Sequence, residues 1–455
     1  MLITSSHNQS VRRSVGKIAI WASAILLVLA LIAFFLTNVY LDRFLKRRIA
    51  STFEKAYPEY SIHIAGLQYK IRTNQLECDS VTALKTDSSV SCSISRLSLS
   101  GISRIRLLLA GGVVAPEDLE CADVHAKGIT VKFPRSLYEL HCERLSVSMP
   151  DSEIVIHMLK LHPSGDDEQF FEGSVFRRTR YRLLIPQCTV KGSACLSIFE
   201  GNVGHARTAH IQNASIDILI NKEKSSPPDS THSVIQDEFL SSVTNIIRLN
   251  TLDVSNARLE YGERFAVRGK PAVLTFDGLG GTAEWPSNSL RHSEPVVVRA
   301  EGTFMSTAAV KVLVSIQAAS RDFTFHYSGS LGRIDLERLN PFLEIAEHKR
   351  LKTGVLYDAD FDIQVIAGSA RGTVRASYKD LKVVEIDKDT GSESGIIKSI
   401  VSFFYNNIKF RTTNMPDDSG SMKIGRVSYN SKSGDTFLEV AWFALRSGIG
   451  DIVGF

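Results

Sequence analysis

Two histidines and two aspartates are the residues of this chain that are best suited, by type and spacing, to bind a metal ion. His157 and His162 precede Asp166 and Asp167, and imidazole and carboxylate groups are common metal ligands. A β-strand that runs into a polar loop explains the same residues equally well. The metal site is therefore the less favoured interpretation.

Six cysteines could carry redox or zinc chemistry, but their spacing argues against it. No two of them form a CxxC pair, which weakens both a zinc site and a thioredoxin-type motif. An oxidising compartment would permit disulfides. We instead expect packed free thiols, since several of these residues occupy an apolar position of the repeat described below. The six are Cys78, Cys92, Cys121, Cys142, Cys188 and Cys195.

The sequence carries none of the common catalytic signatures. It has no glycine-rich phosphate loop, GxSxG motif, HExxH motif or paired-carboxylate signature. Gly278-Leu279-Gly280-Gly281 lacks the helix start that a nucleotide site needs and is typical of a turn. The net charge of +4 is small for 455 residues, so nucleic acid is not indicated as a partner. We predict a protein that is not an enzyme and needs no cofactor.

An uncharged, mostly apolar segment lies between Lys17 and Asp42. At about 1.5 Å per helical residue it can span a hydrocarbon core of roughly 30 Å. It is longer than the apolar part of a cleaved secretory signal. We predict a transmembrane signal anchor over residues 18–41, after a cytoplasmic tail of residues 1–17; a buried core helix is the alternative. The anchor residues are Ile18, Trp21, Leu26, Leu29, Phe34 and Tyr40.

Charge does not settle the orientation of this anchor. Arg12, Arg13 and Lys17 precede it, but the basic cluster from Arg43 to Arg48 follows it. That cluster is suited to contact anionic lipid headgroups.

Two kinds of periodicity follow the anchor. Apolar residues at helical spacing predict an amphipathic connecting helix over residues 42–57, which Pro58 ends. Alternating apolar and polar residues then predict strands that bury one face, in an N-terminal segment 58–220 and a C-terminal segment 238–436. The stretch 221–237 has the composition of a flexible linker. Short helices are expected over about residues 235–249 and 396–405, and from Asn340, with that asparagine as the cap.

A weak repeat suggests that the strands share one irregularity. Its pattern is apolar, any residue, apolar, two polar or small residues, apolar, any residue, apolar. Because the alternation shifts by one position within each copy, we expect a recurrent bulge or tight turn; chance matches are the alternative. Cys78, Cys121, Cys142 and Val254 share one position of the pattern, and we predict that they lie on an apolar groove face. The copies span residues 76–83, 119–126, 140–147, 252–259 and, more loosely, 211–218.

The C-terminal segment 437–455 combines an apolar helix with a glycine-rich tail. The helix is expected to run through about Arg446 and to be apolar all round, except for a stripe of Glu439 and Arg446. We expect that stripe to be exposed to solvent. The helix itself should close the distal end of the sheet or touch a second membrane. The cap residues are Phe437, Val440, Trp442 and Phe443.

Together these patterns predict a mainly β fold. We expect one long, curved antiparallel sheet that forms an open, taco-like groove, with a few short helices besides the anchor and the cap. About 18–20 strands spaced by about 4.8 Å would give a sheet roughly 90 Å long. Since no second layer is evident, such a sheet could bury its apolar face by curling around acyl chains.

Both ends of the chain carry short motifs in a recognisable order. Near the N-terminus these are YLDRFLKRR at 40–48, YSIHI at 60–64, ISRLSLSGI at 94–102 and LLLAGGVV at 107–114. Toward the C-terminus they are GRIDL at 332–336, LNPFL at 339–343, and the runs 353–354, 370–374, 378–383 and 438–450. By these motifs the chain resembles the AsmA-like superfamily, in which a membrane helix is followed by β-segments. The middle of the chain agrees with that family in pattern only.

The resemblance implies a single-pass protein of the inner (cytoplasmic) membrane of a two-membrane bacterium, with the bulk of the chain in the periplasm. It further implies a role in phospholipid transport and outer-membrane biogenesis, with a phospholipid or other membrane lipid as the ligand. Outer-membrane or periplasmic proteins are further candidate partners. The alternative is a non-catalytic assembly or tethering scaffold. A continuous apolar trough would favour lipid transfer, and a closed, self-filled core would favour the scaffold.

Overall fold

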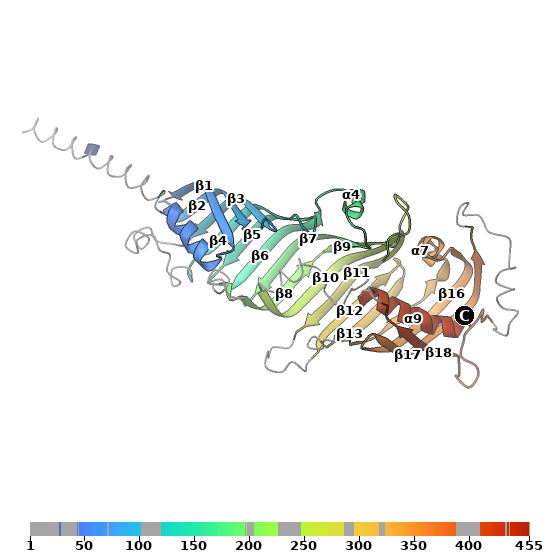
Figure 1. Ribbon diagram of the computed structural model, residues 1–455. Helices are drawn as coiled ribbons and strands as arrows, with labels where there is room; N and C mark the ends of the chain where they lie inside the picture. The colour runs from blue at the N-terminus through green and yellow to red at the C-terminus, as the bar shows by residue number, and fades with distance from the viewer. Residues whose placement is uncertain are drawn as a thin grey trace, which may run out of the picture.

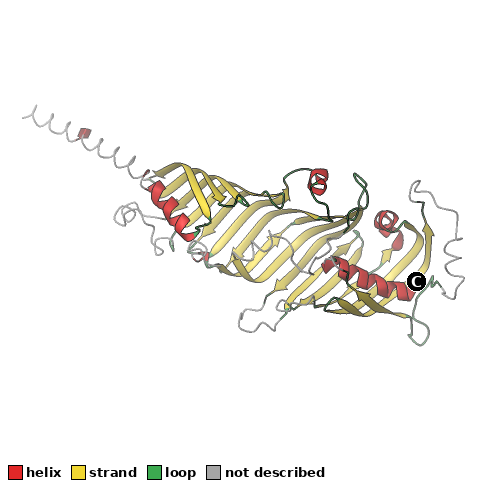
Figure 2. Ribbon diagram, viewed as in Figure 1, coloured by secondary structure: helices red, strands yellow, loops and turns green. Residues whose placement is uncertain are grey.

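The computed structural model shows one long, curved β-sheet that carries a few helices (Figures 1 and 2), which confirms the predicted mainly β fold. The structure describes residues 27–28, 43, 45–70, 72–101, 120–195, 197, 204–225, 247–285, 295–317, 324–387, 410–432, 435 and 437–454. The helix predicted over residues 396–405 lies outside these residues, as does most of the one predicted over 235–249. Residues 247–249 of the latter belong to a strand instead.

The sheet contains 18 strands. In chain order they are β1 (Tyr60–Lys70), β2 (Gln75–Lys85), β3 (Ser91–Ser100), β4 (Asp123–Phe133), β5 (Tyr138–Ser148), β6 (Glu153–Pro163), β7 (Thr179–Lys191), β8 (Gly204–Gln212), β9 (Ser215–Asn221), β10 (Ile247–Arg264), β11 (Ala272–Glu284), β12 (Val296–Phe304), β13 (Ala308–Ile316), β14 (Phe325–Leu331), β15 (Ile334–Asp335), β16 (Lys349–Ile366), β17 (Ser369–Glu385) and β18 (Ile424–Asn430). The helices are residues 45–56, α4 (Asp167–Glu172), the 3-10 helix η1 (Leu336–Leu339), α7 (Asn340–Ala346) and α9 (Phe437–Val453).

Strands that follow one another in the chain lie beside one another in the sheet. From β1 to β7 each strand pairs antiparallel with the next. β8 and β9 lie end to end and together fill the next position, between β7 and β10. From β10 the antiparallel order resumes and runs to β18, with β14 and β15 both pairing with β16.

The sheet is mixed, and the prediction of a purely antiparallel one is wrong at a single place. β10 runs parallel to β8 and β9, with Ile247 beside Gly204 and Arg264 beside Asn221. Two parallel neighbours require a connection that returns along the length of the strand. The stretch 221–237, predicted as a flexible linker, belongs to the part of the chain that joins β9 to β10.

The two rims of the sheet, where the strands end, can be told apart by their connections. α4 precedes β7, and at the same rim β9 ends at Asn221, β10 ends at Arg264 and β11 begins at Ala272. We call this edge the α4 rim. The turn between β16 and β17, at Ile366–Ser369, lies at the opposite rim.

The predicted connecting helix and the helix predicted from Asn340 both form, with one correction. Residues 45–56 are helical and stop before Pro58, as the pattern predicts. α7 begins at Asn340, but the residue in the cap position is Leu339. The Asn340 side chain instead binds both backbone groups of Leu351, with its Oδ1 accepting at 2.8 Å and its Nδ2 donating at 3.0 Å. It therefore fixes the start of β16 rather than the end of its own helix.

Candidate functional site: the apolar face of the sheet

The main candidate site is a row of directly opposed residues that crosses the whole sheet on one face. Each strand position contributes one residue, and every one of them is apolar or glycine. We call this the central row. It consists of Leu67, Cys78, Leu97, Ala126, Leu145, Ile156, Cys188, Ile211, Val254, Gly281, Ala300, Val312, Gly329, Phe361, Val374 and Gly425.

Parallel to the central row lies a line where the alternation of side chains shifts. On consecutive strands one residue lacks a ladder partner at the same register, and several of these residues have positive φ, including Ser80 at 50°, Met158 at 53° and Asn256 at 53°. We call this line the crease. Its members from β1 to β10 are Ala65, Ser80, Ser95, Gly128, Glu143, Met158, Pro186, Asn213 and Asn256.

The crease explains the sequence repeat. A residue with positive φ bends the strand locally, so the apolar residues on both sides of it reach the same face although their spacing changes by one. The recurrent bulge is confirmed in the copies at 76–83, 140–147, 211–218 and 252–259. In the copy at 119–126 the shift coincides with the start of β4, and the crease residue of that strand is Gly128. Gly278, predicted to lie in a turn, is instead a positive-φ position within β11.

The four predicted groove residues do not all lie on this face. Cys78 and Val254 belong to the central row, and Cys142 opposes Ile129 and Leu159 in the neighbouring row. The prediction for Cys121 is wrong, because it lies in the turn before β4 and is exposed. The repeat placed it in the pattern, but no strand has begun at that position.

Thiols on the apolar face are shielded from water. Burial, aided by the neighbouring carboxylates of Asp79 and Glu77, raises the pKa of Cys78 to about 11. Burial raises the pKa of Cys188 to about 11 as well. All six cysteines are free thiols, but the prediction that they are packed holds for Cys78, Cys142, Cys188 and Cys195, whereas Cys92 is partly buried and Cys121 is exposed. Those on the apolar face are packing residues rather than nucleophiles.

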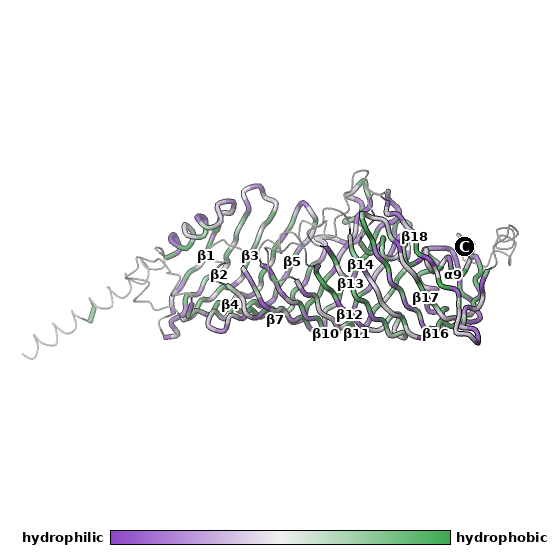
Figure 3. Tube along the Cα trace, turned by 90° about the horizontal axis from the view of Figure 1, so that it is seen from below, coloured by the Kyte–Doolittle hydropathy of each residue, from purple (hydrophilic) through white to green (hydrophobic). Residues whose placement is uncertain are grey.

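Helices cover the two ends of the apolar face. Near β1 the helix of residues 45–56 packs Leu45 and Ile49 onto Ile64, Leu67 and neighbouring apolar side chains. At the far end α9 packs on β16, β17 and β18. The cluster between them contains side chains from β6 to β11 and the β8–β9 link, with no residue from these helices. Figure 3 shows hydrophobic and hydrophilic residues alternating along these strands.

α9 closes the free edge of the sheet at β18. The Arg426 backbone N–H donates to Asp451 Oδ2 at 2.8 Å, and the Ser428 N–H donates to Ser447 Oγ at 3.2 Å. These amides point away from β17 and would otherwise be free to pair with another strand. The glycine-rich stretch, predicted as a tail, continues the helix to Val453. Gly448 and Gly425 make this possible, since a Cβ on Gly425 would lie 2.0 Å from the Gly448 carbonyl oxygen.

The predicted cap residues lie in this helix. Val440 is fully buried, whereas the three aromatic residues are partly buried and stack on rings of the sheet and of α7. The ring pairs are Phe437 with Phe325, Trp442 with Phe342, and Phe443 with Tyr429.

The prediction of an exposed Glu439–Arg446 stripe is wrong. Glu439 is only 1% exposed and binds Lys222 and, at 3.4 Å, Arg177. Arg446 pairs with Glu347 at 2.5 Å. The charged side chain that was expected to face water therefore holds the start of α9 against the α4 rim.

The reach of α9 shows that the apolar face is concave where α9 lies. Glu439 contacts Lys222, next to the end of β9, and Asp451 contacts Arg426 in β18. Along the helix these two acidic residues are about 18 Å apart. Along a flat sheet, the eight strand spacings from β9 to β18 would measure roughly 38 Å. The sheet must therefore bend around α9 (Figure 1).

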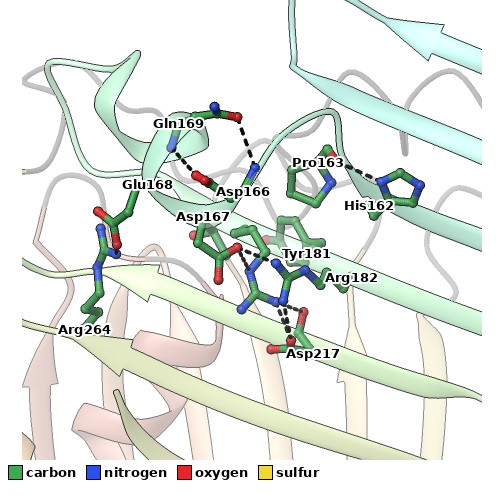
Figure 4. A network of polar contacts seen from close by, with 12 residues as sticks. His162, Pro163, Asp166, Asp167, Glu168, Gln169, Tyr181, Arg182, Asp217 and Arg264 are labelled. Carbon is green, nitrogen blue, oxygen red and sulfur yellow. Dashed lines mark hydrogen bonds and ion pairs between the residues drawn. The ribbon is translucent and has the colours of Figure 1, made fainter. Parts of the chain in front are cut away.

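The candidate metal ligands hold protein partners instead (Figure 4). Asp166 caps α4 by accepting from the Gln169 backbone N–H at 2.8 Å, and Asp167 accepts from Arg182 Nη2 at 2.8 Å. His162 Nδ1 lies 2.8 Å from the Pro163 carbonyl oxygen. No group of three or more His, Cys, Asp or Glu side chains suited to a metal occurs among the described residues. The Asp166-x-x-Gln169 spacing is that of a capping box, a signal available in the sequence.

His157 lies in β6, where its neighbours across the sheet are Arg144 and Gln187. The predicted anchor residues Ile18, Trp21, Leu26, Leu29, Phe34 and Tyr40 lie outside the described residues. Within the described part of the chain, no helix has the length and hydrophobicity needed to cross a bilayer. The membrane anchor stays a prediction from the sequence.

Comparison with known proteins does not assign the chain to a family. No protein-family model matches it, and no curated protein matches it.

Proposed function

We propose that this protein is a membrane-anchored lipid-binding and lipid-transfer protein of the periplasm that contributes to outer-membrane homeostasis, with acyl chains held in a groove on the apolar face. The observation that carries the proposal is the central row. It crosses every strand position without one polar side chain. Between the two helices that cover its ends, a face of this kind offers a hydrocarbon chain apolar surroundings on every strand.

The energetics of acyl-chain burial support such a role. Each buried methylene is stabilised by about 0.8 kcal/mol, so even a few methylenes outweigh thermal energy. The effect is non-directional and proportional to area. A chain could therefore slide along the face without breaking specific bonds, provided that no charge interrupts it.

The experiment is mass spectrometry of lipids that co-purify with the full chain. Ile156 and Val155 are neighbours in β6 on opposite faces, because Ile156 opposes Leu145 and Cys188 whereas Val155 opposes Ser146 and Thr189. Ile156→Asp should remove most of the bound lipid. Val155→Asp is the matched control, since it places the same charge on the polar face, and it should leave the lipid in place.

The second candidate is an assembly or tethering scaffold whose apolar face is filled by the protein itself. The burial of Ile185, Cys188 and Val190, at 6%, 7% and 8% exposed, favours it for the middle of the sheet. In that case no lipid should co-purify with the wild-type chain, and Ile156→Asp should lower stability without changing lipid content.

A further inference from the structure

Five large apolar side chains are exposed together at the α4 rim. They come from three separate segments: the loop between α4 and β7, the turn between β10 and β11, and the first turn of α9. We call them the rim patch. It consists of Val175 (84% exposed), Phe176 (41%), Phe265 (39%), Val267 (56%) and Leu438 (41%).

Backbone hydrogen bonds and ion pairs hold these segments together. The Arg177 N–H donates to the Ser225 carbonyl at 2.8 Å, and the Lys222 N–H donates to the Arg264 carbonyl at 2.7 Å. Arg177 and Lys222 also bind Glu439, the residue after Leu438. Arg264 in turn binds Glu168 of α4 (Figure 4). The exposed side chains therefore project from segments that are held against one another by hydrogen bonds and ion pairs.

The exposed charges on the turn between β10 and β11 are all positive, whereas Glu172 and Glu223 are exposed acidic residues on the adjoining segments. The turn after β10 reads Phe265-Ala266-Val267-Arg268-Gly269-Lys270, with both basic residues exposed and no acidic residue before Asp277. The loop before β7 carries Arg177 and Arg178 directly after Phe176 and has no acidic residue after Glu172. Glu439 adds no exposed negative charge, because it is buried between two cations.

We infer that the rim patch inserts its apolar tips into the surface of a membrane that contains anionic phospholipid. Exposed apolar residues on a rigid rim mark a contact with a protein or a membrane. The flanking arginine and lysine side chains complement anionic headgroups, which lie just above the hydrocarbon that Phe265 and Val267 would enter. Membrane contact by the rim goes beyond lipid binding by the sheet, because the rim can contact a bilayer whether or not acyl chains occupy the apolar face.

The test is photo-crosslinking of the full chain in vesicles of phosphatidylcholine and phosphatidylglycerol that carry a diazirine-labelled acyl chain, with cross-linked peptides identified by mass spectrometry. We expect cross-links at residues 173–178 and 264–270, and a reduction of at least fivefold in vesicles of phosphatidylcholine alone. Val267→Asp should remove those at 264–270. Ile366→Asp is the matched control, since Ile366 is also 56% exposed but lies at the opposite rim.

Three outcomes would overturn the inference. One is the absence of cross-links at the rim patch while other segments are cross-linked. Another is equal cross-linking with and without phosphatidylglycerol. The third combines two observations: Val267→Asp changes a dimer into a monomer, measured by light scattering, and the wild-type rim shows no lipid cross-link. That result would assign the patch to contact with a second copy of the chain. Co-purified lipid tests the proposed function, whereas cross-links at the rim test membrane contact. Failure of one proposal can therefore be told apart from failure of the other.

Discussion

At the scale of single residues, the most informative side chain is Glu439. It belongs to a buried group in which Lys222 and Arg177 supply two positive charges, and Glu263 supplies a second negative one. Tyr261 donates to Glu263 at 2.7 Å, and burial raises the pKa of this phenol well above its usual value. The charges balance, which allows a carboxylate to be buried next to an apolar helix.

Removing this carboxylate should release the start of α9. Glu439→Ala would leave the two cations Lys222 and Arg177 with Glu263 as the one remaining carboxylate of the group, a loss of about 3–5 kcal/mol in local stability. Hydrogen exchange of the α9 amides should speed up at least about a hundredfold. Glu301→Ala is the control, because the Glu301–Lys311 pair is 70% exposed on both sides and should matter little. Unchanged exchange in Glu439→Ala would show that α9 is held by its apolar contacts alone.

The cysteines give a second prediction at this scale. With a pKa of about 11 instead of 9.0, Cys78 and Cys188 should hold about a hundredfold less thiolate at pH 8 than ordinary thiols. Iodoacetamide should therefore modify the exposed Cys121 first and these two at least about a hundredfold more slowly. Equal rates in the native protein would contradict the burial, and equal rates in denaturant serve as the control.

The same shift has a definite pH dependence. Between pH 9 and about 11 the thiols of the unfolded chain ionise while those of the folded chain stay protonated. The stability associated with the buried thiols is therefore complete below pH 9 and is lost as the pH rises to about 11.

At the scale of the elements, the crease is a feature that neighbouring strands share. A single strand could form without it. Asn256 Nδ2 donates to Asn213 Oδ1 at 2.7 Å, so the crease is bridged by side chains where the parallel strands meet. Residues with positive φ recur along it because a shared bend keeps the neighbouring strands in register.

A β-branched residue in the crease should disturb this register. Met158 has a φ of 53°, which valine adopts only with strain. Met158→Val should therefore destabilise β5 to β7 by about 1–3 kcal/mol, whereas Met158→Gly should be tolerated. Lys160→Val is the control, since Lys160 is an exposed residue of the same strand without positive φ. Thermal unfolding followed by circular dichroism measures all three, and equal melting temperatures for the two valine variants would refute the role of the crease.

The contact between α9 and β18 can be tested through its glycines. Gly425→Ala would force the Gly448 backbone away from the strand, because the added Cβ would lie 2.0 Å from its carbonyl oxygen. We expect a loss of about 1–3 kcal/mol in docking and faster limited proteolysis within α9. Gly173→Ala is the control: its added Cβ would lie 3.8 Å from the nearest atoms, and Gly173 does not have a positive φ, so cleavage should not change. Protection of α9 in Gly425→Ala would show that the helix can shift without undocking.

At the scale of the whole molecule, the sequence predicts the strands of the sheet better than the parallel step at β10 or the docking of α9. Alternation around Leu67, Ile156 or Val254 indicates a half-buried strand because each strand carries the pattern within a few residues. The parallel step at β10 could not be found this way, because it depends on the path between Asn221 and Ile247. Nor could the burial of Glu439, whose partners Arg177 and Lys222 lie more than two hundred residues away in the chain.

The candidate site shows the same contrast between what the sequence predicts and what only the fold reveals. The repeat predicted that Cys78, Cys142 and Val254 are equivalent, but only the strand register shows that Cys78 and Val254 share one row and that Cys142 lies in the next. Cys121 fits the pattern and fails because a turn precedes β4. The rim patch was not predicted, since its residues come from two connections and the first turn of α9, which only the fold brings together.

The continuity of the apolar face between its two covering helices predicts that lipid moves along the middle of the sheet. A photo-crosslinking amino acid at Ile129 in β4 or at Val254 in β10 would report lipid on either side of β6. Both residues are partly buried on the apolar face. If lipid enters at the end near the predicted anchor, Ile156→Asp should leave the cross-link at Ile129 and reduce the one at Val254, because a charge in the central row raises the energy of an acyl chain passing it. Val155→Asp, on the other face, should reduce neither.

Loss of both cross-links in Ile156→Asp would mean that the face binds lipid as one unit, and loss of neither would mean that lipid does not travel along the central row.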